Sequence, residues 1–528
     1  MMRRLLSVSA AVLLGSICLC ASASAAAYAS QQDAQVTGDV NTDGRLDDTD
    51  ILLLREWLLG VPAVQLPAWQ AADLNADGSL DARDFTLMKR LRMNASVGKQ
   101  LIDPPVRALH PSLPSAGTDR IPVFAVSFPD CAFSEADAAY LSTCCFDAAD
   151  PACSLFPLES ISAYFERASY GRLTLTGDVI SYTAAHEIDR YAEDHAQDLV
   201  AEILEALDAS LDFRDFDANQ DQILDGMVLA LPAAAIRIDN DGDGVPDWWP
   251  FSGKSSCDDV FDGVCAGAYC VSAFTGNAPT EFVGRTAHEL AHMMGLPDYY
   301  KYTADASGEK DGLPGAAGDE LMDEGTGDLS VCSKLLLGWL SADEILVYTG
   351  ETQTFSLTSM QYAPACILIP KDPAAGYLSE YFLIEYITTE ANNRTAGGNG
   401  IRILHVQAEV SEGRHGPEFT YNNYGLHYDS SNQKQRVLRL VNDNGLFYPG
   451  IRGVQYTDVI DGGIAGFHWY DAEGDLTEDT GLRIRINGFH PGPDYVPDPL
   501  SSLLPTNDPA YRRGSTYSIT VSAADISA

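Results

Sequence analysis

Basic side chains are scarce in this sequence. Its 528 residues include 33 lysines and arginines against 75 aspartates and glutamates, which gives a net charge of −42 at pH 7. Such an excess of negative charge repels nucleic acid and anionic membranes, whereas it suits calcium binding and high solubility. A G-x-S-x-G segment is also lacking, so the nucleophile turn of many serine hydrolases is excluded. With 46% hydrophobic residues, the chain has enough apolar side chains for about three or four packed domains.

The sequence has no stop-transfer pattern after its N-terminal apolar run, which is short. Residues 1–27 begin with Arg3 and Arg4, continue with apolar residues and end with small residues in Ala-x-Ala spacing. This pattern is typical of a secretory signal peptide, with cleavage between Ala23 and Ala27. A retained transmembrane anchor is the alternative, but the apolar run is short for one. We therefore predict a secreted, extracellular protein that does not insert into a membrane.

Cysteines are present, but no two form a C-x-x-C pair. Of the 11 cysteines, Cys18 and Cys20 lie in the signal segment, and the odd number that remains cannot pair completely within one chain. Because export permits disulfides, we interpret the other cysteines as staples of loops. A cysteine zinc site is the alternative, and the connectivity stays open. The two clusters are Cys131, Cys144, Cys145 and Cys153, followed by Cys257, Cys265 and Cys270.

Residues 37–95 contain an internal repeat, GDVNTDGRLDDTDILLLREWL and ADLNADGSLDARDFTLMKRL. Each copy starts with an acidic loop, in which Gly44 or Gly78 takes the sharp-turn position, and continues into a helix with Leu and Ile on one face. Hard oxygen ligands at this spacing suit Ca²⁺. The predicted calcium ligands are Asp39, Asn41, Asp43, Arg45 (through its carbonyl) and Asp50 in the first loop, and Asp73, Asn75, Asp77, Ser79 and Asp84 in the second.

These paired loop-helix units closely resemble a dockerin, the module that attaches a secreted enzyme to a cohesin of a cellulosome-type scaffoldin. The resemblance covers residues 33–95 and implies a small α-helical, calcium-binding domain with a cohesin as its partner. A calcium-loop pair used only for stability is the alternative. The loop positions that often contact cohesin differ between the repeats, Asp48-Thr49 against Ala82-Arg83, so a symmetric two-way binding mode is not expected.

Farther along, the stretch TAHELAHMMGLPDYY (286–300) has the pattern H-E-x-x-H-x-x-G-x-x-D. In a helix, His288 and His292 lie at positions i and i+4 on one face, where both imidazoles can bind a single metal ion. Glu289 lies about 100° around the helix from His288. That is the position of a general base that acts on water without being a ligand.

Gly295, Asp298 and Met322 follow this helix and add to the pattern of a metal site. Gly295 can adopt a positive φ and end the helix, so that Asp298 supplies a third ligand and water takes the fourth position of a tetrahedral zinc. In GDELMDEGTGD (318–328), Met322 lies among glycines, as in the turn beneath the zinc histidines of metzincins. The histidine motif alone also fits an ordinary amphipathic helix, and Met322 an ordinary core methionine. Together they indicate a metzincin-like endopeptidase site.

Several segments around this motif resemble the immune inhibitor A-type secreted metallopeptidases. The resemblance spans residues 120–410 and implies a zinc peptidase fold and activity. It departs from the family at Asp323 and Glu324, where small residues are usual in the Met turn. The similar segments are IPVFAVSFPD (121–130), SISAYFERASYGRLTLTGDV (160–179), KLLLGWL (334–340), EYFLIEY (380–386) and GIRILHV (400–406).

The other segments indicate a multidomain order. Residues 96–119 contain four prolines and predict an extended linker. Residues 120–345 mix strands and helices, which indicates an α+β metzincin-like peptidase domain. Residues 346–528 contain short alternating runs separated by Gly, Pro and Asn, a pattern typical of a β-sandwich. His405, inside one of these apolar strands, is interpreted as a hydrogen-bonded core histidine.

The peptidase domain contains two more acidic loops, FDANQDQILDG (216–226) and IDNDGDGVPD (238–247). Alternation along an extended loop turns the carboxylates to one side, where they repel one another without a cation. Calcium is therefore predicted, with a solvated acidic loop as the alternative. The possible ligands are Asp217, Asn219, Asp221 and Asp225 in the first loop, and Asp239, Asp241, Asp243 and Asp247 in the second.

The sequence thus predicts a secreted zinc endopeptidase that hydrolyses protein or peptide substrates and is attached through its dockerin to a cohesin-bearing scaffold. Zn²⁺ and Ca²⁺ are the expected cofactors. Zinc would activate the water, and Glu289 would take its proton and pass it to the leaving amine. The alternative is a catalytically inactive peptidase-like module that only binds, and the intact motif argues against it.

Overall fold

The computed structural model divides the chain into two compact units, Met1–Val97 and Gly98–Ala528. In the described residues, no helix is both long and apolar enough to span a membrane. The predicted signal segment, residues 1–27, lies outside the described residues. The structure describes residues 38, 40–42, 48–62, 64–74, 78–81, 84–85, 88, 104–191, 195–235, 248, 250–255, 260–300, 320–323, 327–394, 399–413, 416–421, 436–441, 459–461, 467–471, 476–496 and 512–524.

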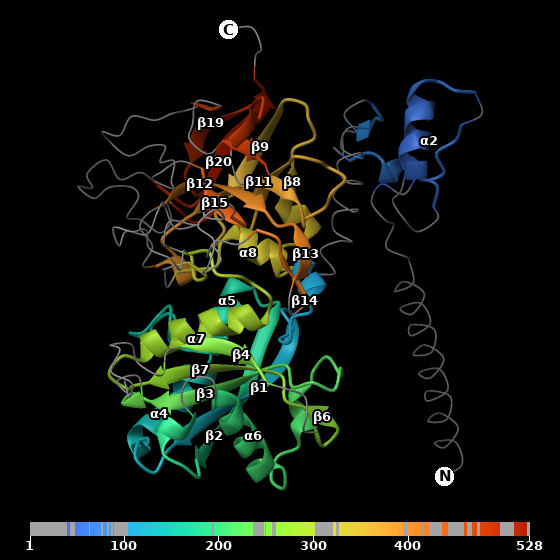
Figure 1. The fold of residues 1–528 in the computed structure, drawn as a ribbon. Coiled ribbons are helices and arrows are strands. Elements are labelled where there is room, and N and C mark those ends of the chain that lie inside the picture. Colours follow the sequence, from blue (N-terminus) through green and yellow to red (C-terminus); the bar gives the residue numbers. More distant parts are fainter. Residues whose placement is uncertain are drawn as a thin grey trace, which may run out of the picture. The chain divides into compact units, whose positions relative to one another are not determined.

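The first unit has a small core between the two halves of the repeat. Helix α2 (Asp48–Leu58) follows the first acidic loop, and the short helix η1 (Trp69–Ala71) precedes the second (Figure 1). Apolar residues of both repeats therefore meet in one core, as the loop-helix pairing predicts. The buried members are Val40, Leu54, Ala72 and Met88.

The second unit contains a five-stranded sheet with the order β2-β1-β3-β7-β4. Neighbouring strands run parallel from β2 to β7, and β4 is antiparallel to β7 at one edge. The central strand β3 has the sequence MVLALP and is buried along its whole length, as its unbroken apolar run predicts. The strands are β1 (Gly117–Ser127), β2 (Leu173–Thr183), β3 (Met227–Pro232), β4 (Phe251–Lys254) and β7 (Ala268–Phe274).

Helices cover both faces of this sheet (Figure 1). Side chains alternate along the strands, so that Phe124 of β1 and Leu229 of β3 pack with Leu199 of α6 in one hydrophobic core. Helices α5 and α7 contact each other and cover the opposite face. The helices are α4 (Glu135–Phe146), α5 (Ile161–Ala168), α6 (Ala196–Leu207) and α7 (Pro279–Met293).

The predicted mixture of helices and strands is present in this domain, where parallel strands joined by helices and one antiparallel edge strand form a mixed α/β arrangement. The alternation of helix and strand in the sequence does not by itself reveal strand direction. Whether two strands run parallel depends on which strands become neighbours in the sheet. Here β1 lies between β2 and β3 and is parallel to both.

The predicted linker, residues 96–119, is also wrong from residue 104 onward. Residues Pro105–Leu109 form the short helix η2, and β1 already begins at Gly117. Leu113 is fully buried, and the Trp339 indole Nε1–H donates to the carbonyl of Ser115 at 2.6 Å. The apolar residues between the prolines thus pack within the second unit instead of extending into solvent.

The residues after 345 are rich in strands, as predicted. One sheet has the order β15-β12-β11-β10-β8, and another has the order β16-β19-β20-β9. Ile384 of β11 and Ile519 of β20 belong to one shared core. The hairpin of β13 and β14 reaches η2 (Figure 1). The strands are β8 (Ile345–Val347), β9 (Gln353–Thr358), β10 (Cys366–Pro370), β11 (Glu380–Ile387), β12 (Gly400–Gln407), β13 (Val410–Gly413), β14 (Gly416–Phe419), β15 (Leu438–Leu440), β16 (Val459–Ile460), β19 (Leu482–His490) and β20 (Thr516–Ala523).

The first cysteine cluster does not form the predicted staples. Cys144 and Cys145 lie in helix α4, not in a loop, and both are fully buried, where thiols pack as small apolar groups. Burial raises the pKa of the Cys144 thiol to about 11. In the second cluster Cys265 is disulfide-bonded, whereas Cys270 is free. The free thiols of the first cluster are those of Cys131, Cys144, Cys145 and Cys153.

Candidate metal centres

Helix α7 ends in a turn that brings the chain back toward its own last residues. The Gly295 N–H donates to the carbonyl of His292 at 2.9 Å, and the Leu296 N–H donates to that of Ala291 at 3.1 Å. This pair of bonds defines a Schellman turn, which needs a residue in the left-handed region. Gly295 has a φ of 100°, which residues other than glycine rarely adopt. The helix therefore stops at the predicted glycine, and Asp298 can face the histidines.

The three predicted zinc ligands converge. The Nε2 atoms of His288 and His292 lie 3.1 Å apart, and Asp298 Oδ1 lies 3.0 Å from the first and 3.3 Å from the second. All three ligand atoms lie within 4.8 Å of one another, and within the described part of the chain no other three His, Cys, Asp or Glu residues meet this condition. Two imidazoles and a carboxylate form a donor set that fits zinc.

The second ring nitrogen of each histidine is held by a backbone carbonyl. His288 Nδ1 lies 2.8 Å from the carbonyl oxygen of Leu321, and His292 Nδ1 lies 2.8 Å from that of Leu296. Because a carbonyl oxygen only accepts, each Nδ1 carries the proton and donates it. Both Nε2 lone pairs are thereby left for a metal, and the ring orientations are fixed. The histidine motif did not indicate these two backbone partners.

Glu289, the predicted general base, lies beside the ligands on α7 and is only 7% exposed. Burial raises the pKa of its carboxyl group, while the imidazoles of His292 and His288 oppose this rise. Ser252 of the edge strand β4 lies beside this carboxylate and favours its charged form. Ser252 is thus a site residue that the motif did not predict.

The electrostatics of the ligand cluster favour a positive charge within it. Burial disfavours a charged His288, yet the carboxylates of Asp298 and Glu289 outweigh that effect and raise the pKa of His288 to about 9. Burial likewise opposes a charged Asp298, but hydrogen bonds with His288 and His292 hold its pKa well below the usual range. A proton or a metal ion can supply the positive charge.

The turn around Met322 is fastened to the site through its backbone. Met322 is fully buried, and its carbonyl accepts the N–H of Tyr299 at 2.7 Å. The buried carboxylate of Glu320 accepts the N–H groups of Met322 and Ser330. Asp323 of the unusual acidic pair is buried as well, and Glu324 lies outside the described residues. Acidic side chains thus support this turn, a role the sequence did not indicate.

A cleft of about 460 Å³ borders the cluster and is lined by His292, Asp298 and Ser252. Its other wall includes Pro417, Glu418 and Phe419 of β14, which lies in the C-terminal strand-rich region. The hairpin formed by β13 and β14 therefore contributes directly to the candidate active site. No motif in the sequence marked these residues.

The two predicted calcium loops of the first unit contain equivalent buried carboxylates. Asp50 accepts the N–H of Val40 at 3.0 Å, and Asp84 accepts the N–H of Leu74 at 3.0 Å. Both aspartates are fully buried and occupy the last ligand position of their loops. Of the other predicted ligands the structure describes Asn41, Asp73 and Ser79, while Asp39, Asp43, Arg45, Asn75 and Asp77 lie outside the described residues.

The acidic loop before β3 is ordered by its own side chains. Asp217 and Asn219 accept the N–H of Asp221 at 3.0 and 2.8 Å. Asp225 is 1% exposed and lies beside Asp119 of β1, which is equally buried. Burial raises the pKa of both carboxyl groups, and the charge of Asp119 raises that of Asp225 further. Calcium in this loop stays a prediction, and the ligands predicted for the second loop, Asp239, Asp241, Asp243 and Asp247, lie outside the described residues.

Comparison with known proteins identifies part of the first unit. Residues 37–91 match the family described as Dockerin type I domain, which confirms the resemblance predicted for this segment. Such a domain implies binding of calcium and of a cohesin module on an extracellular scaffold. No curated protein matches the chain.

Among solved structures, the chain is similar to OgpA from Akkermansia muciniphila. Two crystal forms of the wild-type protein share 15% and 14% identity and cover 56% of this chain and 90% and 91% of their own, each with a TM-score of 0.25. Catalytically inactive OgpA in complex with an O-glycopeptide substrate shares 13% identity over 56% of this chain and 90% of its own, also with a TM-score of 0.25. This score is too low to establish a common fold.

Proposed function

We propose that the second unit is a secreted zinc-dependent endopeptidase with a metzincin-like site, akin to the immune inhibitor A-type metallopeptidases that its motifs resemble. The observation that carries the proposal is the convergence of His288 Nε2, His292 Nε2 and Asp298 Oδ1, with both Nδ1 atoms turned away to backbone carbonyls. We interpret the two C-terminal sheets with their shared core as the predicted β-sandwich.

The chemistry follows from the donor set and from the residue beside it. Zinc bound there would act as a Lewis acid on a scissile carbonyl and lower the pKa of a water molecule. Glu289 lies in a buried position from which its carboxylate takes a proton from water and delivers it to the leaving amine. Ser252 lies beside that carboxylate and favours its charged form.

The shape of the site supports a polypeptide substrate. Among the described strands, β4 is at the edge of its sheet, which is the position where an extended chain can pair with a sheet through backbone hydrogen bonds. Its residue Ser252 lines the cleft beside His292 and Asp298. A substrate paired along β4 would therefore pass directly over the metal ligands.

The surface of the first unit supports attachment to a protein partner. Contiguous exposed apolar side chains mark an interaction surface, and the described part of the first unit has five large apolar side chains that are exposed. We infer that a cohesin covers this surface and thereby displays the peptidase on a scaffold outside the cell. The exposed side chains are Leu52 (47% exposed), Trp57 (41%), Leu59 (69%), Val61 (41%) and Trp69 (39%).

The test is digestion of an unfolded protein by the purified full-length chain. Hydrolysis should stop with 1,10-phenanthroline and return when zinc is added, whereas the 1,7 isomer, which cannot chelate, should have no effect. Hydrolysis that continues at full rate after zinc has been removed would contradict the proposal.

A further inference from the structure

We propose that the peptide cleft continues beyond the zinc ligands into a larger cavity, and that this cavity selects substrates with an acidic side chain near the scissile bond. The inference rests on the proposed peptidase function and adds its substrate class. The larger cavity has a volume of about 720 Å³ and contains none of the zinc ligands.

Two smaller cavities lie between the zinc ligands and this larger one. The first, of about 460 Å³, is lined by His292 and Ser252. A second, of about 210 Å³, shares both residues and is also lined by His110 and Lys254. His110 and Lys254 in turn line the cavity of about 720 Å³. A bound chain can therefore extend from the metal ligands into the large cavity without leaving the protein surface.

Strand β4 sets the spacing along this path. Side chains at alternate positions of a strand point to the same face, about 7 Å apart, so Lys254 lies on the face of Ser252. Ser252 lines the cleft together with His292 and Asp298, and thus lies at the reacting end of the cleft. An extended substrate along β4 would place a side chain two or three residues from the scissile bond next to Lys254.

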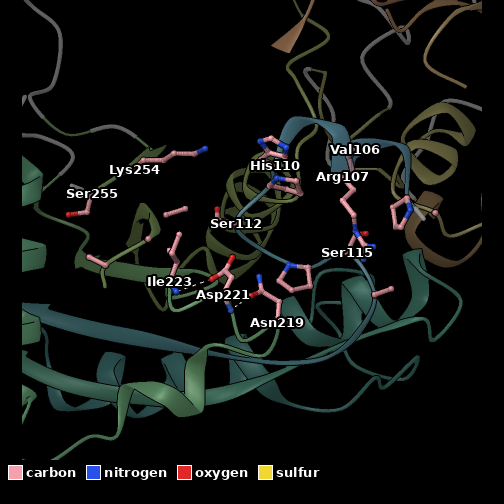
Figure 2. Close-up of a pocket in the computed structure, with 18 residues that line it drawn as sticks. Val106, Arg107, His110, Ser112, Ser115, Asn219, Asp221, Ile223, Lys254 and Ser255 are labelled. Atoms are coloured by element: carbon pink, nitrogen blue, oxygen red, sulfur yellow. Dashed lines mark hydrogen bonds between the residues drawn. The ribbon is translucent and has the colours of Figure 1, made fainter. Parts of the chain in front are cut away.

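The large cavity collects cationic and donor groups in a chain that has few of them. Arg107, His110 and Lys254 line it, and Figure 2 shows the Lys254 side chain extended toward His110, across the cavity from Asp221 and Asn219. Asp221 is the single acidic residue of the described lining, and its carboxylate accepts the N–H of Ile223 at 2.9 Å. The net charge of −42 disfavours binding of acidic peptides to the chain in general. The cationic side chains of this cavity would instead attract an acidic side chain.

His110 is held in an uncommon backbone conformation that directs it into this path. Its φ of 51° is in the left-handed region, which non-glycine residues rarely occupy outside constrained turns. The His110 N–H donates to the carbonyl of Arg107 at 3.0 Å, which closes the end of η2. The same turn therefore places two of the three donor side chains at the cavity.

The experiment has two stages and uses the zinc-loaded full-length chain. A peptide library derived from a proteome first gives the residue preference at each position around the cleaved bond. The best-cleaved sequence is then synthesised with Glu or Gln at the preferred position, and kcat/KM is measured for wild type and for Lys254→Glu. Arg190→Glu is the matched control, since Arg190 is exposed, pairs with Asp198 and lines none of the three cavities.

Wild type should prefer Glu over Gln about twofold to fivefold, as expected for one exposed charged contact. Lys254→Glu should lose or invert this ratio, and Arg190→Glu should keep it. Cleavage without an acidic preference, or a ratio unchanged in Lys254→Glu, overturns this inference but leaves the peptidase function standing. A wild-type chain that loads zinc but cleaves no peptide of the library overturns both.

Discussion

His405 is fully buried in strand β12, and its Nε2 lies 2.9 Å from Glu380 Oε1. Burial, together with the nearby charges of Arg439 and Lys371, lowers the pKa of His405 to about 4, although Glu380 opposes this shift. The ring is therefore neutral at pH 7 and donates its Nε2–H to the carboxylate. The prediction of a hydrogen-bonded core histidine is confirmed.

This burial makes stability depend on pH in a defined direction. Below about pH 6.5 the unfolded chain protonates this histidine, while the folded chain resists protonation until about pH 4. Stability contributed by the neutral ring is thus lost as the pH falls through this window, by up to about 3 kcal/mol. In thermal unfolding between pH 7 and pH 5, His405→Gln should show a shallower loss of Tm than wild type.

The control is His195→Gln, because the side chain of His195 is 61% exposed. It should follow the wild-type curve. Equal slopes for wild type and His405→Gln would contradict the assigned role of the buried ring.

At the residue scale, the sequence predicted the groups that bind but not those that hold them. His288 and His292 follow from helical periodicity, and Asp298 from the glycine that ends the helix. The carbonyl of Leu321 and the hydroxyl of Ser252 reach the site through tertiary packing, which short-range spacing does not encode. Motifs report local geometry, so partners from other elements are missed.

Among the elements, the loop 217–225 gives the sharpest test of calcium in the second unit. Asp225 and Asp119 are buried side by side, and a bound cation would relieve their repulsion. Calcium at a hundred times its dissociation constant stabilises by about 2.7 kcal/mol, which corresponds to a rise in Tm of about 5 °C for a large domain. The second unit, from Gly98 onward and with zinc held constant, should show this rise.

The combined variant Asp217→Asn and Asp221→Asn should abolish the calcium effect. Asp208→Asn serves as the control, since Asp208 is exposed just after α6. A wild-type Tm that does not respond to calcium would reduce this loop to a solvated acidic turn.

Some features of the elements follow from the sequence, and the connections do not. The end of helix α7 follows from the histidine motif and Gly295, and the buried strand β3 from its apolar run, whereas α7 begins already at Pro279, before the motif. The proline-rich segment was misassigned because its few apolar residues, such as Val106 and Leu113, show no period although both are buried. Val106 packs against Gly295, and a Cβ added at Gly295 would lie only 3.1 Å from the Cβ of Val106. That contact links regions far apart in the sequence.

For the molecule as a whole, two separate compact units predict separable functions. The first unit has a small core, so its fold should depend on bound calcium. Asp39→Ala combined with Asp73→Ala should abolish binding to a panel of type I cohesin modules, measured by calorimetry. Hydrolysis of a peptide substrate should not change. Cohesin binding by this double variant in EGTA would contradict the role assigned to the calcium loops.

The most direct test of the central claim compares wild type with Glu289→Ala in zinc content and in peptide hydrolysis. Glu289 lies beside the ligands but does not belong to the converging set. The variant should therefore bind zinc near one ion per chain while its turnover falls by about a hundredfold to ten-thousandfold, the usual contribution of a general base. Full activity in Glu289→Ala would contradict the mechanism. A zinc-loaded wild type without hydrolysis would identify the domain as a binding module.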